Sequence, residues 1–275
     1  MKAAIICVTI FSMAMLGSFA HALEPFALYD KFSSKILDET KWYGSETIAA
    51  GVDILEQVRQ ISGGRLHVLS RFYGNMSSNT GTSRGFYKLE FANPDPITAM
   101  EATVQVKSVE ADGCAANSTP TDVSAAIQGA FFNTGTPTPG SELNDVLGLI
   151  YIQRASNSTD KPGILEVRGA ISQCNDATCA TYTVLNSTTL GTIKAGATTT
   201  LSIQWDQPNH QFIFKFGKLA PVHLAYAVSD TSSPGVNFKD LRFRNYIANC
   251  MTPPRLIAFM EAYFGNVFVN QSAAP

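Results

Sequence analysis

The chain has 275 residues, 20 basic and 22 acidic side chains, a formal net charge of -2, and 45% hydrophobic against 15% charged residues. This near-balance of charge gives no field that would gather nucleic acid or an anionic membrane surface, so we expect neither as a partner. The hydrophobic fraction excludes disorder over most of the length.

Residues 1–22 have the pattern of a secretory signal peptide. Lys2 gives a positive start, an almost unbroken apolar run follows, and Ala20-His21-Ala22 places small residues at a cleavage site. The run is shorter than the about 20 apolar residues of a membrane anchor. We therefore expect a secreted or periplasmic protein, with residues 23–275 as one domain and no membrane span.

Further along the chain, short runs alternate apolar and polar residues, which is the pattern of a strand with one buried face. In Met100–Lys107, for example, every second residue is apolar. About a dozen such strands with turn signals between them predict an all-β sandwich or barrel. The predicted strands are Ile54–Ile61, Leu66–Tyr73, Ser83–Phe91, Met100–Lys107, Ser124–Phe132, Val146–Arg154, Ile164–Ile171, Thr181–Leu185, Thr199–Trp205, Phe212–Phe216, Val222–Val228 and Phe238–Phe243.

Turn chemistry and the last segment complete the predicted elements. Ser62-Gly63-Gly64 predicts a tight hairpin, because Gly tolerates the positive φ that such turns require. Pro253 and Pro254 could begin a helix. The residues from Ala262 to Asn270 are rich in β-branched and aromatic types, however, so we predict a closing strand over Met260–Val269.

The chain without residues 1–22 keeps four cysteines, an even number that favours disulfides in an exported protein. Cys174 and Cys179 flank a short loop between two predicted strands, a spacing that suits a bridge across a hairpin. By elimination Cys114 would pair with Cys250, although four cysteines allow three connectivities. The lone C-x4-C has no nearby His and lacks the spacing of a zinc site, so we interpret all four as structural.

Three segments resemble the concanavalin A-like lectin and glucanase superfamily, which includes laminin-G-like modules and laminarinase-type glycosidases. Tyr29–Ser33 followed by Leu37–Trp42 resembles the opening of such domains, "D-x-F, then L-D-x-x-x-W". Leu201–Asp206 with Phe212–Gly217 resembles their paired aromatic strands, and Ala262–Asn270 resembles the final strand that returns beside the first. The resemblance implies a single-domain antiparallel jelly roll of two sheets, with a concave face that often binds glycans.

The chain departs from the laminarinase pattern at the catalytic strand. Those enzymes carry E-x-D-x-x-E on one strand, because two carboxylates on one face must flank the glycosidic bond. No such triplet occurs here. Retaining hydrolysis by Glu101 and Glu166 would need neighbouring strands that bring the carboxyls to about 5 to 5.5 Å. We therefore expect no catalytic residues.

Other motifs for site chemistry are weak. Gly81–Gly85 matches G-x-S-x-G, but a nucleophile elbow needs a strand before it and a helix after it, whereas here a polar loop precedes and a strand follows. The histidines form no metal pair by spacing. We expect no cofactor. The resemblance allows a structural calcium ion, because many members of the superfamily hold one, and the sequence does not identify its ligands.

Candidate ligand contacts are polar and aromatic side chains on predicted strands and loops. Sugars present flat apolar faces rimmed by hydroxyls, so their sites pair Tyr or Trp platforms with Asn, Gln, Arg and carboxylate partners. One group surrounds residues 74–81 and another occupies alternating strand positions. The candidates are Arg71, Tyr73, Asn75, Arg84, Tyr87, Tyr151, Gln153, Glu166 and Arg168.

Three functions follow as hypotheses. The leading one is an exported, non-catalytic sandwich that binds carbohydrate or another extracellular ligand. The second is a polysaccharide hydrolase or lyase with an unrecognised active site, which depends on analogy to the superfamily alone. The third is a structural or adhesive protein of the cell envelope whose sheets contact protein partners.

Overall fold

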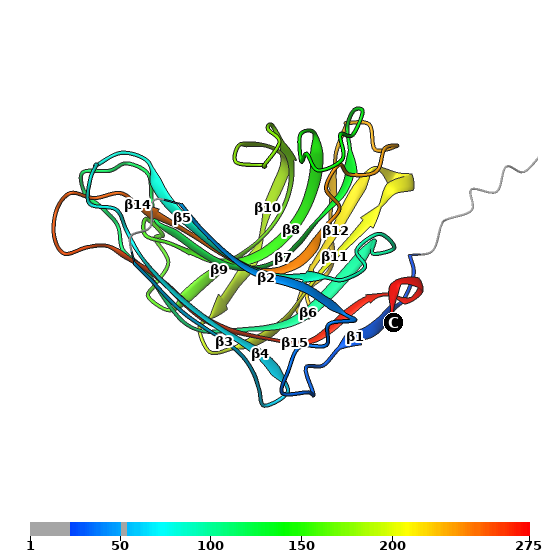
Figure 1. Cartoon of the computed structure of the whole chain (residues 1–275), viewed down its shortest axis with the longest axis horizontal. Helices are drawn as coiled ribbons and strands as arrows, with labels where there is room; N and C mark the ends of the chain where they lie inside the picture. Colours follow the sequence, from blue (N-terminus) through cyan, green and yellow to red (C-terminus); the bar gives the residue numbers. More distant parts are fainter. Residues whose placement is uncertain (1–22, 51–53) are drawn as a thin grey trace, which may run out of the picture.

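A computed structural model describes residues 23–50 and 54–275, and for residues 45–50 it describes the backbone alone. The predicted signal peptide lies outside the described residues. Two antiparallel sheets stack face to face, and the predicted all-β sandwich is confirmed (Figure 1). No helix in the described part of the chain is long and apolar enough to cross a membrane.

Sheet A contains eight strands and sheet B contains seven. In spatial order, sheet A consists of β13 (Val222–Ala225), β12 (Gln211–Phe216), β11 (Thr198–Asp206), β6 (Ala99–Ala111), β15 (Ile257–Asn270), β4 (Arg65–Tyr73) and β3 (Ile54–Ser62), with β1 (Phe26–Asp30) also paired to β15. Sheet B consists of β10 (Tyr182–Lys194), β9 (Ile164–Cys174), β8 (Asp145–Ala155), β7 (Asp122–Asn133), β14 (Lys239–Ala248), β5 (Thr82–Phe91) and β2 (Trp42–Ala50).

The apolar residues of each alternating strand face the space between the sheets and form one core. In β6, for example, Met100, Ala102, Val104 and Val106 are buried, as the alternation predicts. Burial of apolar area contributes roughly 25 cal/mol per Å² and is the main term that holds two such sheets together. The outer face of sheet B carries polar and apolar side chains together, and β7 and β8 are buried along most of their length on both faces.

The opening motif is a packing unit at the edge of this core. Phe32 stacks on Trp42 with ring centroids 5.5 Å apart, and the Trp42 Nε1–H donates to Asp30 Oδ2 at 2.7 Å. Tyr29 contacts the edge of the Trp42 ring, with the centroids 5.4 Å apart. The aromatic and acidic positions of the motif therefore fix β1 and the start of β2 to each other.

The closing strand over Met260–Val269 is confirmed within β15, and no helix forms there. β15 lies between β6 and β4 and also pairs with β1, as Figure 1 shows near the C label. The hairpin at Gly63 and Gly64 joins β3 to β4, and both glycines have positive φ (59° and 69°). The expected return of the final strand beside the first is thus present.

Both predicted disulfides form, Cys174–Cys179 and Cys114–Cys250. Such bonds are typical of proteins in oxidising compartments outside the cytosol. Elsewhere the prediction of elements was incomplete. The strand predicted to end at Leu185 continues to Lys194 in β10, and β13 ends at Ala225, before the predicted Val228.

Candidate functional site

The outer face of sheet B is concave and holds a groove of about 430 Å³ that crosses strands β10, β9, β8, β7, β14 and β5. The residues of β5, β7, β9 and β14 that line the groove all have even numbers, and the side chains between them enter the core. We call this surface the groove. It is lined by Arg84, Phe86, Lys88, Gln128, Glu142, Leu147, Leu149, Tyr151, Arg168, Ala170, Ser172, Thr178, Cys179, Tyr182, Val184, Ser187, Phe238, Arg242, Arg244 and Tyr246.

Strand register arranges the floor of the groove in rows of residues that face each other across neighbouring strands. The first row runs Arg168, Tyr151, Ala126, Arg242 and Lys88, from β9 to β5. Tyr151 is 9% exposed and packs beside Ala126. Because the Ala126 side chain is small, the groove is deeper there than at its neighbours Tyr151 and Arg242.

The second row runs Gln153, Ser124, Arg244 and Phe86. The Arg244 guanidinium lies 5.4 Å from the ring centroid of Tyr151 and 5.3 Å from that of Tyr246. Arginine over aromatic rings gains cation–π energy and loses rotamer freedom. Arg244 is therefore held in place by two rings before any ligand arrives.

The third row joins Asp122, Tyr246 and Arg84. Burial raises the pKa of the Asp122 carboxyl, although Arg244 and Arg168 act in the opposite direction. Burial also raises the pKa values of Tyr151 and Tyr246. Both phenols therefore stay protonated at neutral pH and can donate a hydrogen bond into the groove.

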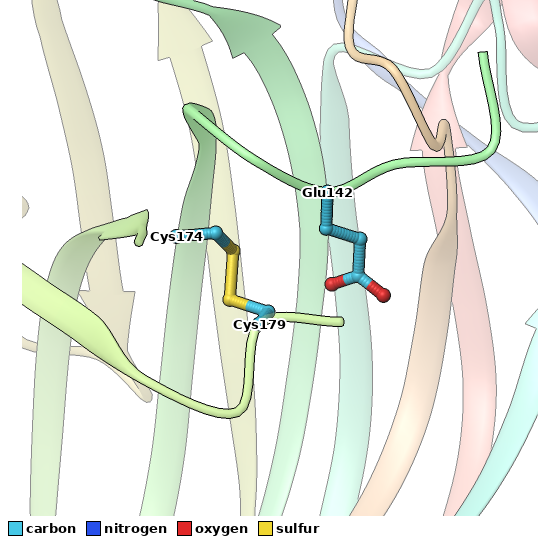
Figure 2. A group of neighbouring side chains, drawn as sticks. All are labelled: Glu142, Cys174 and Cys179. Carbon is cyan, nitrogen blue, oxygen red and sulfur yellow. A yellow bond between two sulfur atoms is a disulfide. The ribbon is translucent and has the colours of Figure 1, made fainter. Parts of the chain in front are cut away.

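At one end, the groove is bordered by the loop between β9 and β10, and the Cys174–Cys179 disulfide closes this loop. Figure 2 shows the Glu142 carboxylate beside this bond. Burial raises the pKa of Glu142. These three residues are the one group of metal-ligand type that lies close together among the described side chains. Because the two sulfur atoms are bonded to each other, they are not thiolate ligands, and a structural calcium ion stays an expectation from the resemblance.

The structure divides the candidate residues predicted from the sequence. Arg84, Tyr151 and Arg168 line the groove. Gln153 and Glu166 lie on the same face just beyond it, where Gln153 Nε2 donates to Glu166 Oε2 at 2.7 Å.

The remaining candidates lie elsewhere. Arg71 and Tyr73 are on the outer face of sheet A, where both donate hydrogen bonds to the Glu56 carboxylate, at 2.7 and 3.1 Å. Asn75 is in the loop after β4, where its side chain accepts from the Ser77 N–H. The prediction that Tyr87 contacts a ligand was wrong. Its side chain is 1% exposed and lies in the core, because it points to the opposite face of β5 from Arg84, Phe86 and Lys88.

The carboxylate pair that hydrolysis would require is separated. Glu101 is on β6 of sheet A, and Glu166 is on β9 of sheet B, so the two strands are not neighbours. The groove lining contains a single acidic side chain, Glu142, among the described residues. Sequence reasoning missed Arg242, Arg244 and Tyr246, although their alternation along β14 was a usable signal.

A second hollow of about 580 Å³ lies between residues 95–98 and 230–239, outside the groove. Lys239 borders it and is 2% exposed. Its ammonium donates to Ala130 O at 2.5 Å and to Asn237 Oδ1 at 2.9 Å, and burial lowers its pKa to about 7. Short polar loops make up most of this hollow, and its aromatic side chains are Phe131, over which the Lys239 ammonium lies at 4.6 Å from the ring centroid, and Trp205.

The low pKa of Lys239 predicts a pH-dependent stability. The unfolded chain keeps this proton up to pH about 10.4, and the folded chain releases it near pH 7. Between these values the unfolded state binds more protons, so stability rises with pH by up to about 1.4 kcal/mol per pH unit. Urea unfolding at pH 7, 8 and 9 should show this rise in the unmodified protein and lose it in Lys239→Met. The exposed Lys215→Met is the control, and parallel curves for all three proteins would contradict the assignment.

The chain is similar to several solved structures at low sequence identity. A laminarinase from a Flavobacterium species is 13% identical, covering 91% of this chain and 100% of its own, with a TM-score of 0.42. An endo-β-galactosidase from Clostridium perfringens is 11% identical over 89% of this chain, with a TM-score of 0.44, and this chain spans 64% of it. A carbohydrate binding module from Bacillus subtilis is 7% identical, covering 80% of this chain and 92% of its own, with a TM-score of 0.34.

No protein-family model matches the chain, and a search of curated proteins also finds no match. The fold follows from the strand order of the chain itself, and the properties of the groove follow from its own side chains.

Proposed function

We propose that the groove on sheet B binds a carbohydrate chain without cleaving it. The observation that carries this proposal is the floor itself, an open surface crossing six strands that contains both tyrosine and phenylalanine rings and hydrogen-bonding side chains. Flat rings contact the apolar faces of sugars, and guanidinium, amide and hydroxyl groups bond to their edges. The length of the groove across the sheet suits a polymer better than a single sugar.

Two tyrosines supply the contact area. Tyr182 on β10 is 44% exposed and borders the groove, whereas Tyr151 forms part of its floor. An exposed ring has few packing partners to lose on substitution, so Tyr182 is the better residue to change in a binding test. Burial raises the pKa of the Tyr151 phenol, which leaves it as a hydrogen-bond donor to sugar oxygens at neutral pH.

Tyr182→Ala should weaken polysaccharide binding about ten-fold, because loss of one aromatic contact costs about 1.4 kcal/mol. Calorimetric titration with a panel of plant, algal and microbial polysaccharides measures the affinity, and a rise in melting temperature gives an independent readout. Tyr73→Ala removes a tyrosine from sheet A and should leave the affinity unchanged. Equal losses in the two variants would contradict binding in the groove.

The same panel tests the alternatives. Release of reducing or unsaturated ends from any polysaccharide would contradict a role in binding alone and would favour the hydrolase or lyase hypothesis. Stable self-association without affinity for any polysaccharide would favour the structural or adhesive hypothesis.

A further inference from the structure

The groove concentrates positive charge on a protein whose formal net charge is -2. Five cationic side chains line it, against one acidic side chain, Glu142, among the described residues. These cations are Arg84, Lys88, Arg168, Arg242 and Arg244. A neutral glycan does not need such an excess, because hydroxyls are recognised by uncharged partners as well.

Two of the five cations already have anionic partners. Arg242 Nη2 lies 2.5 Å from Asp240 Oδ2, and Lys88 Nζ lies 2.5 Å from Glu90 Oε1. Both carboxylates are on the same strands as the cations they neutralise, β14 and β5. These pairs belong to the structure of the sheet and contribute little net charge to a ligand.

The other three cations, Arg84, Arg168 and Arg244, form no salt bridge with a described side chain. The Nε atoms of Arg168 and Arg244 are also buried and lack a hydrogen-bond partner. A buried donor without a partner is costly, and the cost is removed when an acceptor arrives. Arg168 and Arg244 therefore each keep one donor that an anionic oxygen could fill, while Arg168 Nη2 already donates to Ser187 Oγ at 3.5 Å.

The register places these three arginines along a diagonal of the groove. Arg168 is in the first row on β9, Arg244 in the second row on β14, and Arg84 in the third row on β5. Four strand spacings of about 4.8 Å separate β9 from β5, or roughly 19 Å. A chain laid across the strands thus meets in turn three guanidiniums without a salt bridge to a described side chain, although the buried Asp122 carboxyl acts on Arg168 and Arg244.

We propose that the groove selects an acidic polysaccharide, whose repeated carboxylate or sulfate groups bind Arg168, Arg244 and Arg84. This inference rests on the proposed function and adds the chemical class of the ligand. The planar guanidinium bonds carboxylate and sulfate oxygens through two N–H groups, which sugar hydroxyls cannot match. The exposed Tyr182 contacts the sugar rings between the charged groups.

The test compares charged and uncharged forms of the same polymer on the unmodified protein. Polygalacturonate against its fully methyl-esterified form examines carboxylates, and carrageenan against agarose examines sulfates. We expect the charged member of one pair to bind at least ten-fold more tightly, and to weaken as salt is added. The pair that shows the difference identifies the anionic group.

Variants then locate the effect. Arg168→Gln with Arg244→Gln should lower the affinity for the charged polymer at least ten-fold, whereas Arg71→Gln, on sheet A, should not. Near-ultraviolet circular dichroism checks that each variant is folded, and the comparison of polymers on the unmodified protein does not depend on the variants.

Other outcomes overturn the inference in distinguishable ways. Equal affinity for both members of each pair would remove the acidic selectivity and leave the carbohydrate-binding proposal in place. Affinity for none of the polysaccharides would remove both. A single-stranded oligonucleotide that binds as tightly as the charged polymer would show that the groove responds to charge alone, and would also overturn the inference.

Discussion

Replacing Cys114 and Cys250 together by Ser should lower the free energy of unfolding by about 5 kcal/mol. The disulfide joins residues 136 apart in sequence, so its loss frees a long loop in the unfolded state. It also ties the loop after β6 to the segment between β14 and β15, and both cysteines are buried. Urea unfolding without reductant measures the change.

The second disulfide provides the control. Cys174 and Cys179 are only 5 residues apart, so their replacement by Ser should cost about 2 kcal/mol in the same measurement. Equal losses, or a larger loss for the short loop, would show that chain entropy does not govern these bonds.

Arg242→Met should lower the free energy of unfolding by about 3–5 kcal/mol at pH 7. Arg242 pairs with Asp240, whose side chain is fully buried beneath the groove. Burial raises the pKa of Asp240, and Arg242 opposes that rise. Without Arg242 the folded protein must either bury an unpaired carboxylate or protonate it, and both options favour unfolding at neutral pH.

The pH dependence separates this cause from simple loss of packing. When Arg242 is removed, the folded pKa of Asp240 rises further above the unfolded value, so the folded state binds more protons than the unfolded state. Stability should then recover as the pH falls toward 4. Urea unfolding between pH 4 and 7 measures this, with Arg71→Met as the control for an exposed pair. A loss that does not change with pH would contradict the electrostatic cause.

Local alternation predicted the strands and their buried faces well, because a half-buried strand must repeat every two residues. The same rule explains the error at Tyr87. Arg84 and Tyr87 are three positions apart on one strand, so they lie on opposite faces, and one of them had to enter the core.

The allocation of strands to sheets could not be predicted from local patterns. Arg71 and Tyr73 alternate as regularly as Tyr151 and Gln153, but β4 pairs with β15 in sheet A and β8 pairs with β7 in sheet B. β7 directly precedes β8, whereas β15 is far from β4 in sequence, so the sheet that β4 joins depends on a long-range pairing. Arg244 and Tyr246 were missed because the predicted strand ended at Phe243, whereas β14 continues to Ala248.

The position of β15 has a consequence for how the protein folds. Sheet A is incomplete until residues 257–270 insert between β6 and β4. One hydrogen bond that then forms, between His67 and Glu261, joins residues 194 positions apart in the chain. Contacts of such long range slow folding. Until the insertion occurs, β4 and β6 present unpaired edges, which are aggregation-prone. We expect refolding yields to fall steeply with protein concentration, and a chaperone that shields exposed strands to restore them.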